Sequence, residues 1–251
     1  MQGVILAGGL GTRLRSLICD RPKPMAPAGG KPFMEYLITH MARQDLDEIL
    51  ICIGYMGQQI MDHFGFGEDF GVHIRYSWED FPLGTAGALR NAASHLEETF
   101  ILVNGDTYFP CPYAGLLEFH RSQKALATLA VQKKEYPAGY GEVVLDSTGR
   151  VTSFRESDSA SAAWVNAGLY VMERKILEWV PDCGAYSLER ELLPKMLAMG
   201  KLVSGYGFDP PISGEEEIFA GAEMELHPFT DIGIPERYRA FKESIEGGKE
   251  I

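Results

Sequence analysis

The sequence is poor in cysteine and has no long hydrophobic run. Its four cysteines are scattered over 251 residues without the CxxC spacing of zinc sites, so we expect buried or idle thiols and no disulfide framework. No apolar stretch reaches the roughly 18 residues of a membrane-spanning helix. The apolar segment Met1–Ala7 is far too short for a signal peptide. These absences predict a cytoplasmic protein without a membrane partner.

Basic residues are scarce relative to acidic ones. The chain has 23 Lys and Arg against 35 Asp and Glu, a formal net charge of −12. Because a general nucleic-acid binder needs a broad basic face, we expect no nucleic-acid partner. The first 31 residues depart from this trend with a local balance of +4, which coincides with a run of glycines and favours a site for a small polyanion. The charged residues of this segment are Arg13, Arg15, Arg21, Lys23 and Lys31, against Asp20.

The first half of the chain alternates short runs rich in Val, Ile and Phe with longer helical patterns. This βαβ rhythm predicts a Rossmann-like, three-layer α/β/α fold with a mostly parallel central sheet. Ligands of such sheets bind beyond the carboxyl ends of the strands. Strands are predicted over Gln2–Ala7, Glu48–Ile53, Val72–Trp78 and Thr99–Val103, and helices over Pro32–Gln44, Gly57–Phe64, Leu83–Leu96 and Tyr113–Gln123.

The second half is less regular, and we expect additional antiparallel strands there. Strands are predicted over Ala125–Gln132, Glu142–Asp146, Val151–Arg155 and Val165–Met172. Helices are predicted over Arg174–Trp179, Leu188–Met199, which Pro194 should interrupt, and Pro235–Glu246. The segment Gly205–Glu217 is rich in glycine, proline and acidic residues, a composition that predicts a surface loop. Because no repeat or long linker marks a boundary, we expect a single domain over 1–251.

A glycine-rich segment, Gly8–Arg13, follows directly on the first predicted strand. Glycines there allow a tight turn and leave backbone N–H groups free to approach phosphate oxygens, while Arg13 can neutralise phosphate charge. The pattern is not a dinucleotide fingerprint, because Leu14 stands where the third glycine should be. The segment around Lys31 is no Walker loop, because it lacks the earlier glycine at the required spacing. Taken alone, a glycine-rich segment after a strand is a purely structural turn about as often as it is a ligand-binding site.

Lys23 follows a short way downstream, between two prolines. Pro22 and Pro24 restrain the backbone, so a flexible ammonium group is presented from a fixed loop. A lysine in this setting is usually an ordinary surface residue. Its joint occurrence with the glycine-rich segment is what points to phosphate binding.

Together these segments resemble the sugar-phosphate nucleotidyltransferase family, whose first signature is Leu-Ala-Gly-Gly-x-Gly-Thr-Arg-Leu followed by Lys-Pro. Leu6 to Leu14 and Lys23-Pro24 match it throughout. Within the family, residues 15–33 resemble most closely the D-glycero-α-D-manno-heptose 1-phosphate guanylyltransferases. The resemblance implies an enzyme that joins a sugar 1-phosphate to a nucleoside triphosphate and releases pyrophosphate. It continues in the family's order at Pro82–Gly87, Asn104–Asp106, Tyr140-Gly141, Glu156, Asn166–Tyr170 and Asp231–Gly233.

The resemblance assigns Arg13 and Lys23 to catalysis, at the departing pyrophosphate and the reacting phosphates. Glu79 lies in the segment that reads the base, and guanine is the common base with two adjacent donors on its pairing edge. A carboxylate acceptor therefore favours GTP, although Asp80 could take this role, and either carboxylate could simply be solvated. The implied nucleotide-binding residues are Leu6, Ala7, Gly8, Gly9, Gly11, Thr12, Glu79, Gly84 and Thr85.

Two aspartates are implied to bind Mg²⁺. Asp106 ends the apolar run that begins at Thr99, which predicts a carboxylate at the carboxyl edge of the sheet, although such residues often form caps or turns. The second is Asp231, which could equally cap the helix predicted near Pro235. One or two carboxylates together with substrate phosphates are the ligands that Mg²⁺ prefers.

The implied sugar subsite has one departure from the family. Glu156 is implied to accept from two ring hydroxyls, a suitable task for a carboxylate. The family commonly has Lys after this Glu to hold the sugar phosphate, whereas this chain has Ser157. Arg15, Arg21 or the metal alone could hold the phosphate instead. The implied sugar-binding residues are Asn104, Tyr140, Gly141, Glu156, Asn166 and Gly168.

This chemistry needs no catalytic histidine, and the six histidines lie outside every motif. A sugar phosphate has a second pKa of about 6, so its oxygen can attack without a general base. Catalysis then rests on positioning and charge neutralisation by Lys23, Arg13 and Mg²⁺. We expect the nucleotide-binding part over about 1–110 and the sugar-binding part over about 111–251.

Several alternatives stay open at this stage. Mannose 1-phosphate with GTP, or another sugar phosphate with UTP or dTTP, would suit the same motifs. A nucleotide-sugar sensor without turnover is supported only by Ser157, and a Rossmann oxidoreductase is disfavoured by the missing third glycine. The sequence does not predict whether the chain forms a homo-oligomer.

Overall fold

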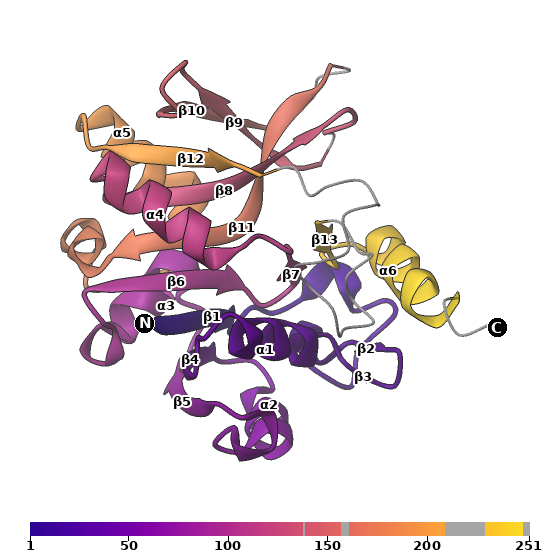
Figure 1. The fold of residues 1–251 in the computed structure, drawn as a ribbon. Coiled ribbons are helices and arrows are strands. Elements are labelled where there is room, and N and C mark those ends of the chain that lie inside the picture. The colour runs from indigo at the N-terminus through magenta and orange to yellow at the C-terminus, as the bar shows by residue number, and fades with distance from the viewer. Residues whose placement is uncertain (138, 157–160, 209–228, 248–251) are drawn as a thin grey trace.

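A nine-stranded sheet is the centre of the computed structural model, which describes residues 1–137, 139–156, 161–208 and 229–247 (Figure 1). The strand order is β10-β9-β11-β6-β1-β4-β5, with β8 paired to β11 and β12 paired to β8. The strands are β1 (Gln2–Ala7), β4 (Glu48–Ile53), β5 (His73–Trp78), β6 (Thr99–Asn104), β8 (Ala127–Lys134), β9 (Gly141–Leu145), β10 (Val151–Glu156), β11 (Ala163–Glu173) and β12 (Val203–Gly207).

Within the nine-stranded sheet, the four strands from the first half of the chain are parallel and stand in the order β5-β4-β1-β6. The chain order therefore reverses between β1 and β6. In open α/β sheets, such a switch point is where ligands bind, outside the carboxyl ends of the strands. Strand β11 runs antiparallel to β6, β8 and β9, so the antiparallel additions come from the second half, as predicted.

Helices cover both faces of the sheet, because successive strand residues point to opposite sides. Ile51 of β4 packs with one set of helices, and its neighbour Leu50 packs with the other. This arrangement confirms the predicted three-layer α/β/α fold. The first set is α1 (Phe33–Arg43), α2 (Gly57–Phe64), α4 (Tyr113–Gln123) and α6 (Pro235–Gly247), and the second is α3 (Gly84–Asn91) and α5 (Leu193–Ala198).

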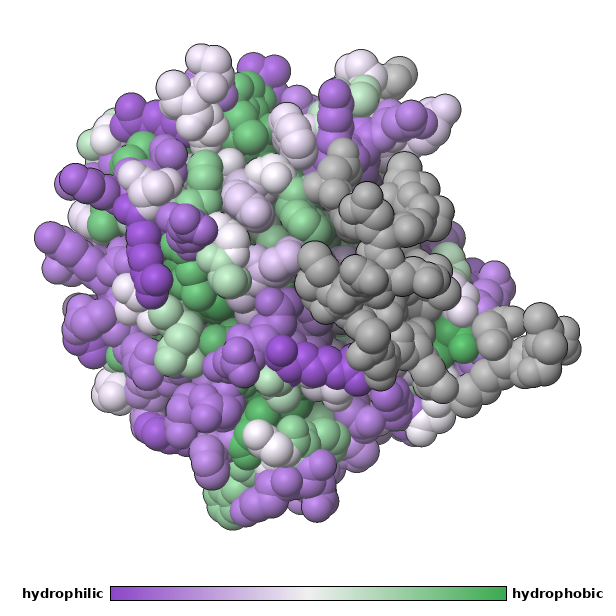
Figure 2. All heavy atoms as spheres, viewed as in Figure 1, coloured by the Kyte–Doolittle hydropathy of each residue, from purple (hydrophilic) through white to green (hydrophobic). Residues whose placement is uncertain are grey.

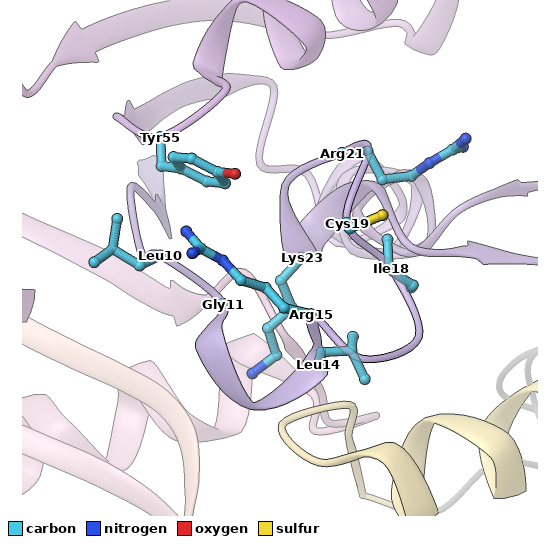
Figure 3. A pocket seen from close by; sticks show the side chains of 9 residues that line it. All are labelled: Leu10, Gly11, Leu14, Arg15, Ile18, Cys19, Arg21, Lys23 and Tyr55. Carbon is cyan, nitrogen blue, oxygen red and sulfur yellow. The ribbon is translucent and has the colours of Figure 1, made fainter.

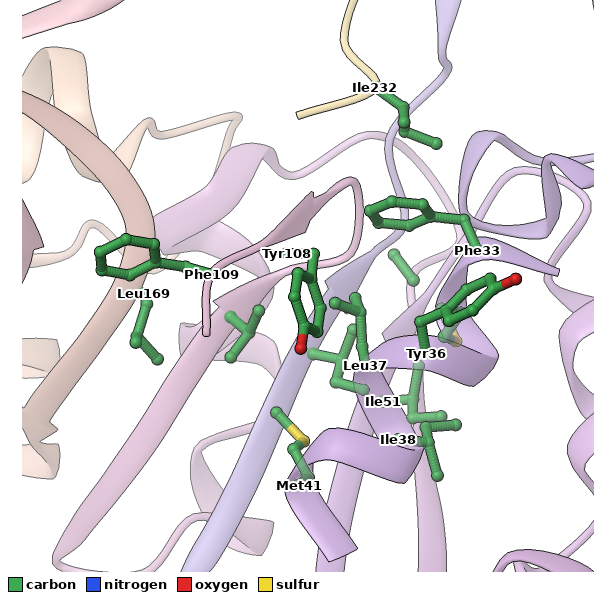
Figure 4. Packing of buried hydrophobic residues seen from close by; sticks show 14 of the residues in the cluster. Phe33, Tyr36, Leu37, Ile38, Met41, Ile51, Tyr108, Phe109, Leu169 and Ile232 are labelled. Atoms are coloured by element: carbon green, nitrogen blue, oxygen red, sulfur yellow. The ribbon is translucent and has the colours of Figure 1, made fainter. Parts of the chain in front are cut away.

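Helix α6 is anchored on α1 and on a small hairpin, β2 (Pro27–Ala28) with β3 (Lys31–Pro32). The Phe241 ring meets the Phe33 ring edge-on at a centroid distance of 5.1 Å. The Tyr238 hydroxyl donates to the Pro27 carbonyl at 2.7 Å. Figure 4 shows Phe33 on α1 with Ile232, from the segment that leads into α6, beside it. These contacts fix the chain just after Asp231.

The predicted elements of the first half agree closely with the structure, and β1, β4, α2 and α4 have the predicted bounds. Helix α3 is shorter than predicted and gives way to a 3₁₀ turn at Ala93–His95. The helix predicted over Leu188–Met199 divides into a π-helical turn, Leu188–Leu192, and α5. Pro194 explains the break, because proline has no N–H for the helix ladder. Arg174–Trp179 is a 3₁₀ helix.

The prediction of a surface loop over Gly205–Glu217 is wrong at its start. Gly205 and Gly207 belong to β12, a strand parallel to β8 whose first residues are buried. The glycines serve close packing, because a Cβ at Gly205 would lie 2.5 Å from the Leu145 side chain and one at Gly207 would lie 2.9 Å from the ring of Trp164. The rest of the predicted loop, from 209 onward, lies outside the described residues.

A partly buried hydrogen-bond network ties α3 to β11 through Glu189. One carboxylate oxygen of Glu189 accepts from the Thr85 hydroxyl at 2.9 Å, and the other accepts from the Tyr170 hydroxyl at 3.1 Å. Tyr170 is completely buried, so its hydroxyl has no water to replace a lost acceptor. Asn166 donates to the same hydroxyl at 2.7 Å, which extends the network along β11.

We expect Glu189→Ala to lower the free energy of unfolding by about 1–3 kcal/mol, because it leaves the buried Tyr170 hydroxyl without its acceptor. The matched control is Glu178→Ala, which removes an exposed glutamate from the nearby 3₁₀ helix and should change stability by less than about 0.5 kcal/mol. Urea denaturation of both variants checks this. Equal stability of the two variants would contradict the role of Glu189.

Candidate active site

The loop after β1 is built around two glycines with different constraints. A Cβ added at Gly8 would lie 2.9 Å from the carboxyl carbon of Glu79, so only glycine allows the buried carboxyl group this close to the loop. Gly11 has a left-handed φ of 60°, and a Cβ there would lie 3.2 Å from the Cβ of Lys23. The predicted glycine-rich segment is thus brought against two other predicted site residues, Glu79 and Lys23.

The neighbouring predicted residues lie at the same edge of the sheet. Leu6 and Ala7 end β1, and the Leu6 carbonyl accepts from the Gly105 N–H at 2.9 Å, which joins the loop to the turn after β6. Thr12 and Arg13 are exposed in a 3₁₀ turn. In the described part of the chain, no ion pair engages the Arg13 guanidinium, so it is available for an anion.

Lys23 lies between the two predicted metal ligands. Its ammonium group forms an ion pair with Asp106, directly after β6, and the Lys23 side chain is 16% exposed. The same nitrogen lies next to Gly233, where an added Cβ would be 3.5 Å away, in the turn that follows Asp231. Three segments far apart in the sequence therefore meet at one ammonium group.

A short ladder, β7 (Thr107–Tyr108) with β13 (Thr230–Asp231), holds the two aspartates together. Asp231 is the register partner of Thr107, and the Ile232 N–H donates to the Asp106 carbonyl at 2.9 Å. This ladder was not predicted, because two-residue strands leave no periodic signal in the sequence. It fixes both carboxylates at the carboxyl edge of the sheet.

The two aspartates fit a divalent cation that takes further ligands from elsewhere. Each carboxylate is already neutralised, Asp106 by Lys23 and Asp231 by Arg237 of α6. Within 1–137, 139–156, 161–208 and 229–247, no group of three or more His, Cys, Asp or Glu side chains could hold a metal ion. Two hard oxygen donors suit a cation that is also bound by phosphate oxygens.

Glu79, and not Asp80, is the carboxyl group that faces the glycine-rich loop. Glu79 is only 8% exposed, whereas Asp80 is exposed. Burial raises the pKa of the Glu79 carboxyl group, and the Leu83 N–H, which donates to it at 3.2 Å, opposes that rise. With one hydrogen bond in the described structure, this carboxyl group retains capacity to accept from a ligand.

Gly84 and Thr85 begin α3 and contact the turn before Glu189. Gly84 has a left-handed φ of 71°, and a Cβ there would lie 2.7 Å from the Tyr186 carbonyl oxygen. The Thr85 hydroxyl accepts from the Leu188 N–H at 2.7 Å and donates to Glu189. The Thr85 side chain is therefore engaged within the protein, so its predicted ligand contact would have to come from the backbone.

An irregularity in β11 shapes the opposite side of the site. The pairing of β11 with β8 shifts register between Asn166 and Tyr170, and Gly168 there has a left-handed φ of 65°. The Gly168 N–H donates to the Asn166 side chain at 3.0 Å. A Cβ at Gly168 would lie 3.0 Å from the side-chain nitrogen of Asn104. The side-chain oxygen of Asn104 is buried and has no hydrogen-bond partner among the described residues. Asn166 thus shapes the turn, whereas Asn104 offers a free acceptor.

Tyr140 is the centre of a cationic cluster that the sequence did not reveal. The Arg237 guanidinium carbon lies 3.7 Å from the centroid of the Tyr140 ring, and the Lys134 ammonium lies 4.9 Å from it. Burial lowers the pKa of Lys134, and the nearby Arg237 lowers it further. Gly141 pairs with Glu156 of β10 through the backbone, whereas Ser157 lies outside the described residues.

The two arginines considered as substitutes for the family lysine are engaged elsewhere. Figure 3 shows Arg15 reaching toward Tyr55, with its guanidinium carbon 4.8 Å from the ring centroid. Arg21 forms an ion pair with its neighbour Asp20 and points away from Lys23 in the same view. Neither arginine has a described contact with Tyr140 or Asp231.

The part of the surface that is coloured by hydropathy in Figure 2 is mostly polar. Figure 2 shows hydrophilic residues over most of this face, with apolar residues in small groups. None of the helices in the described ranges is long and apolar enough to cross a bilayer. All four cysteines are free thiols, two of them buried, Cys52 and Cys111, and two exposed, Cys19 and Cys183.

This chain is similar in sequence and in fold to several known proteins. The D-glycero-alpha-D-manno-heptose 1-phosphate guanylyltransferase of Aneurinibacillus thermoaerophilus is 35% identical over 247 residues, 98% of this chain and 99% of that protein. The mannose-1-phosphate guanylyltransferase of Mycobacterium tuberculosis is 37% identical over 202 residues, 80% of this chain and 56% of that protein. The crystal structure of HddC from Yersinia pseudotuberculosis complexed with GMP-PN has a TM-score of 0.79 and 30% identity, and the match covers 96% of this chain and 98% of that one.

A sequence profile described as "Nucleotidyl transferase" matches residues 2–210. The match begins in β1 and extends past β12, so it includes the glycine-rich loop, Lys23 and Asp106. The resemblance that these residues carry in the sequence is confirmed. The chain belongs to the nucleotidyl transferase family and is an enzyme of that type.

Proposed function

We propose that this enzyme transfers a guanylyl group from GTP to D-glycero-α-D-manno-heptose 1-phosphate, which yields a GDP-sugar and pyrophosphate. The observation that carries the proposal is Lys23, held between Asp106 and the turn after Asp231, next to the glycine-rich loop. This arrangement combines a cation for phosphates with two carboxylates for a divalent metal. The names of the Aneurinibacillus and Yersinia relatives, the latter with bound GMP-PN, support the guanine nucleotide and the heptose phosphate.

The reaction needs one bond to form and one to break at the α-phosphorus of GTP. An oxygen of the sugar phosphate attacks, and the bond to the departing pyrophosphate breaks. Backbone N–H groups of Gly8, Gly9, Gly11 and Thr12 would bind the triphosphate, and the exposed Arg13 would neutralise the pyrophosphate. Lys23 would neutralise the reacting phosphates. Because the attacking oxygen is already ionised, positioning and charge neutralisation suffice without a general base.

Asp106 and Asp231 are the proposed Mg²⁺ ligands. A bound Mg²⁺ would draw the phosphates together by neutralising their charge. For this, the two carboxylates have to exchange their ion pairs with Lys23 and Arg237. The cations released in this exchange would remain beside the anionic substrates, so no charge would be left unpaired.

Glu79 is the proposed reader of the base. Its carboxylate would accept from the two adjacent donors on the pairing edge of guanine. Leu6, Ala7 and the backbone of Gly84 and Thr85 would complete the surroundings of the nucleotide. Its position against Gly8 and its burial support Glu79 over the exposed Asp80.

The sugar would lie on the side of the site that the second half of the chain builds. The proposed sugar contacts are made by Asn104, Tyr140, Gly141, Glu156, Asn166 and Gly168. The unpartnered oxygen of Asn104 supports a ligand there, since buried polar atoms are rarely left without a partner. We accordingly propose a nucleotide-binding part over about 1–110 and a sugar-binding part over about 111–251, which together form the single domain.

Mannose 1-phosphate is the second candidate acceptor. The Mycobacterium tuberculosis relative that carries this activity in its name is 37% identical over 80% of this chain. This chain spans only 56% of that protein, whereas it spans 99% of the Aneurinibacillus relative. The heptose phosphate is therefore the better supported acceptor.

Pyrophosphate release tests the proposed function. With Mg²⁺, GTP and D-glycero-α-D-manno-heptose 1-phosphate, we expect faster release than with UTP, dTTP or mannose 1-phosphate. Lys23→Ala should lower kcat by about 10²–10³-fold, because it removes a cation from the reacting phosphates. Lys175→Ala, which removes an exposed lysine on a distant 3₁₀ helix, is the matched control and should keep full activity. Faster turnover with UTP or dTTP would overturn the choice of guanine.

Substitution of Glu79 tests the reading of the base. Glu79→Gln should raise the KM for GTP roughly tenfold, because an amide offers only one acceptor to the two donors of guanine. In the wild type, the KM for GTP should fall as pH rises through the raised pKa of Glu79, since only the ionised group accepts twice. This pH dependence should vanish in Glu79→Gln and persist in the control Asp80→Asn. A KM for GTP that is unaffected by Glu79→Gln would exclude Glu79 as the reader.

A further inference from the structure

The position that follows Glu156 poses a problem of charge. The family resemblance implies a lysine there for the sugar phosphate, whereas this chain has Ser157. A phosphate that has to approach a triphosphate meets strong repulsion unless cations surround it. A further cation of this chain next to the sugar would lower that repulsion, in addition to Lys23 and the metal.

Two cations converge on the Tyr140 ring from separate parts of the fold. Lys134 ends β8, and its ammonium lies 4.9 Å from the Tyr140 ring centroid and 4.8 Å from that of Phe229. Arg237 belongs to the first turns of α6, and its guanidinium carbon lies 3.7 Å from the same Tyr140 centroid. The two aromatic rings are themselves 5.6 Å apart.

The charges of this cluster are not balanced within the described residues. Arg237 has one carboxylate partner, Asp231, and also donates to the Gly139 carbonyl at 3.2 Å. Lys134 is partly buried, and its ammonium forms no ion pair with a carboxylate in the ranges that the structure describes. Two like charges next to partly buried rings repel each other, and an anion bound between them would relieve that repulsion.

The cluster lies between the residues proposed to bind the sugar and the residues proposed to bind the metal. Tyr140 adjoins Gly141, whose backbone pairs with Glu156 on the proposed sugar side. Arg237 adjoins Asp231 on the proposed metal side. In a sugar 1-phosphate, the group between the ring and the reacting centre is the phosphate.

We infer that Lys134 and Arg237 form the subsite for the phosphate of the acceptor sugar and replace the missing family lysine. The inference rests on the proposed function. Lys134 would contribute a mobile point charge with three donors. Arg237 would contribute the N–H groups that its bond to the Gly139 carbonyl leaves free once Asp231 has exchanged its ion pair for the metal. The Tyr140 ring holds both cations on the sugar side of the metal ligands.

Lys134→Met is the most selective test. Methionine keeps an apolar chain against the rings of Tyr140 and Phe229 and removes only the charge. The matched control is Lys133→Met, because Lys133 is the exposed neighbour on the same strand and points to the opposite face. Arg237 is less suitable for a first test, because its loss would also free the Asp231 carboxylate.

We expect Lys134→Met to raise the KM for D-glycero-α-D-manno-heptose 1-phosphate roughly 10- to 100-fold, the loss of a charge-assisted contact, with the KM for GTP unchanged. Lys134→Arg should restore most of the affinity, and Lys133→Met should behave like the wild type. Calorimetric titration of the full chain with the heptose 1-phosphate should show the same loss without turnover. If Lys134→Met folds poorly by circular dichroism, Lys134→Gln serves in its place.

The outcomes separate this inference from the proposed function. An active wild type whose KM for the heptose phosphate is unaffected by Lys134→Met and Lys134→Gln would overturn the inference alone. A rise in the KM for GTP equal to that for the acceptor would also overturn it. A wild type that releases no pyrophosphate from GTP with any sugar 1-phosphate would instead overturn the proposed function.

Discussion

The balance of charge around Lys23 is the interaction on which the site depends. One largely buried ammonium group is held by Asp106 next to the turn after Asp231, and Arg237 neutralises the second carboxylate. Carboxylates that lie partly out of water are costly unless they are paired. The ion pairs therefore keep four charged groups together before substrate arrives. Substrate phosphates and a divalent metal would bring charges of both signs. The carboxylates could then bind the metal while the two cations bind the phosphates, so that no charged group is left without a partner.

The fold brings these groups together by features that lie far from the chemistry. The reversal of strand order between β1 and β6 places the glycine-rich loop next to Asp106. The ladder of β7 with β13 brings Asp231 to the same edge, and the packing of Phe241 of α6 on α1 holds it there. Glycine is needed at position 8 because the Glu79 carboxyl group lies against the loop, and at position 11 because the backbone there is left-handed and Lys23 is close. The site is therefore a property of the whole sheet and of its last helix.

Much of this arrangement could be predicted from local sequence. Alternating and helical patterns predicted the bounds of β1, β4, α2 and α4, because buried strands and amphipathic helices carry their period in the chain. The signature that contains Gly8 and Lys23 indicated the family, because the glycine-rich segment and the lysine between prolines are specific when they occur together, whereas neither is specific alone. Strand β12 was missed because its glycines serve close packing against Leu145 and Trp164, which only the folded chain reveals.

The remaining features depend on tertiary packing and leave no local signal. Glu189 lies in a helical turn like many surface glutamates, yet it accepts from Thr85 and Tyr170 in the interior. Lys134 and Arg237 meet only because β8 and α6 converge on Tyr140.

Anomalous scattering from Mn²⁺ would test the central claim most directly. Crystals of the enzyme with Mn²⁺ and a non-hydrolysable GTP analogue should show an anomalous peak bonded to the carboxylates of both Asp106 and Asp231. In the same crystals, the Lys23 ammonium should have left Asp106 and should contact a phosphate oxygen of the nucleotide. A bound nucleotide with the metal elsewhere, or with the Lys23–Asp106 ion pair intact, would contradict the account.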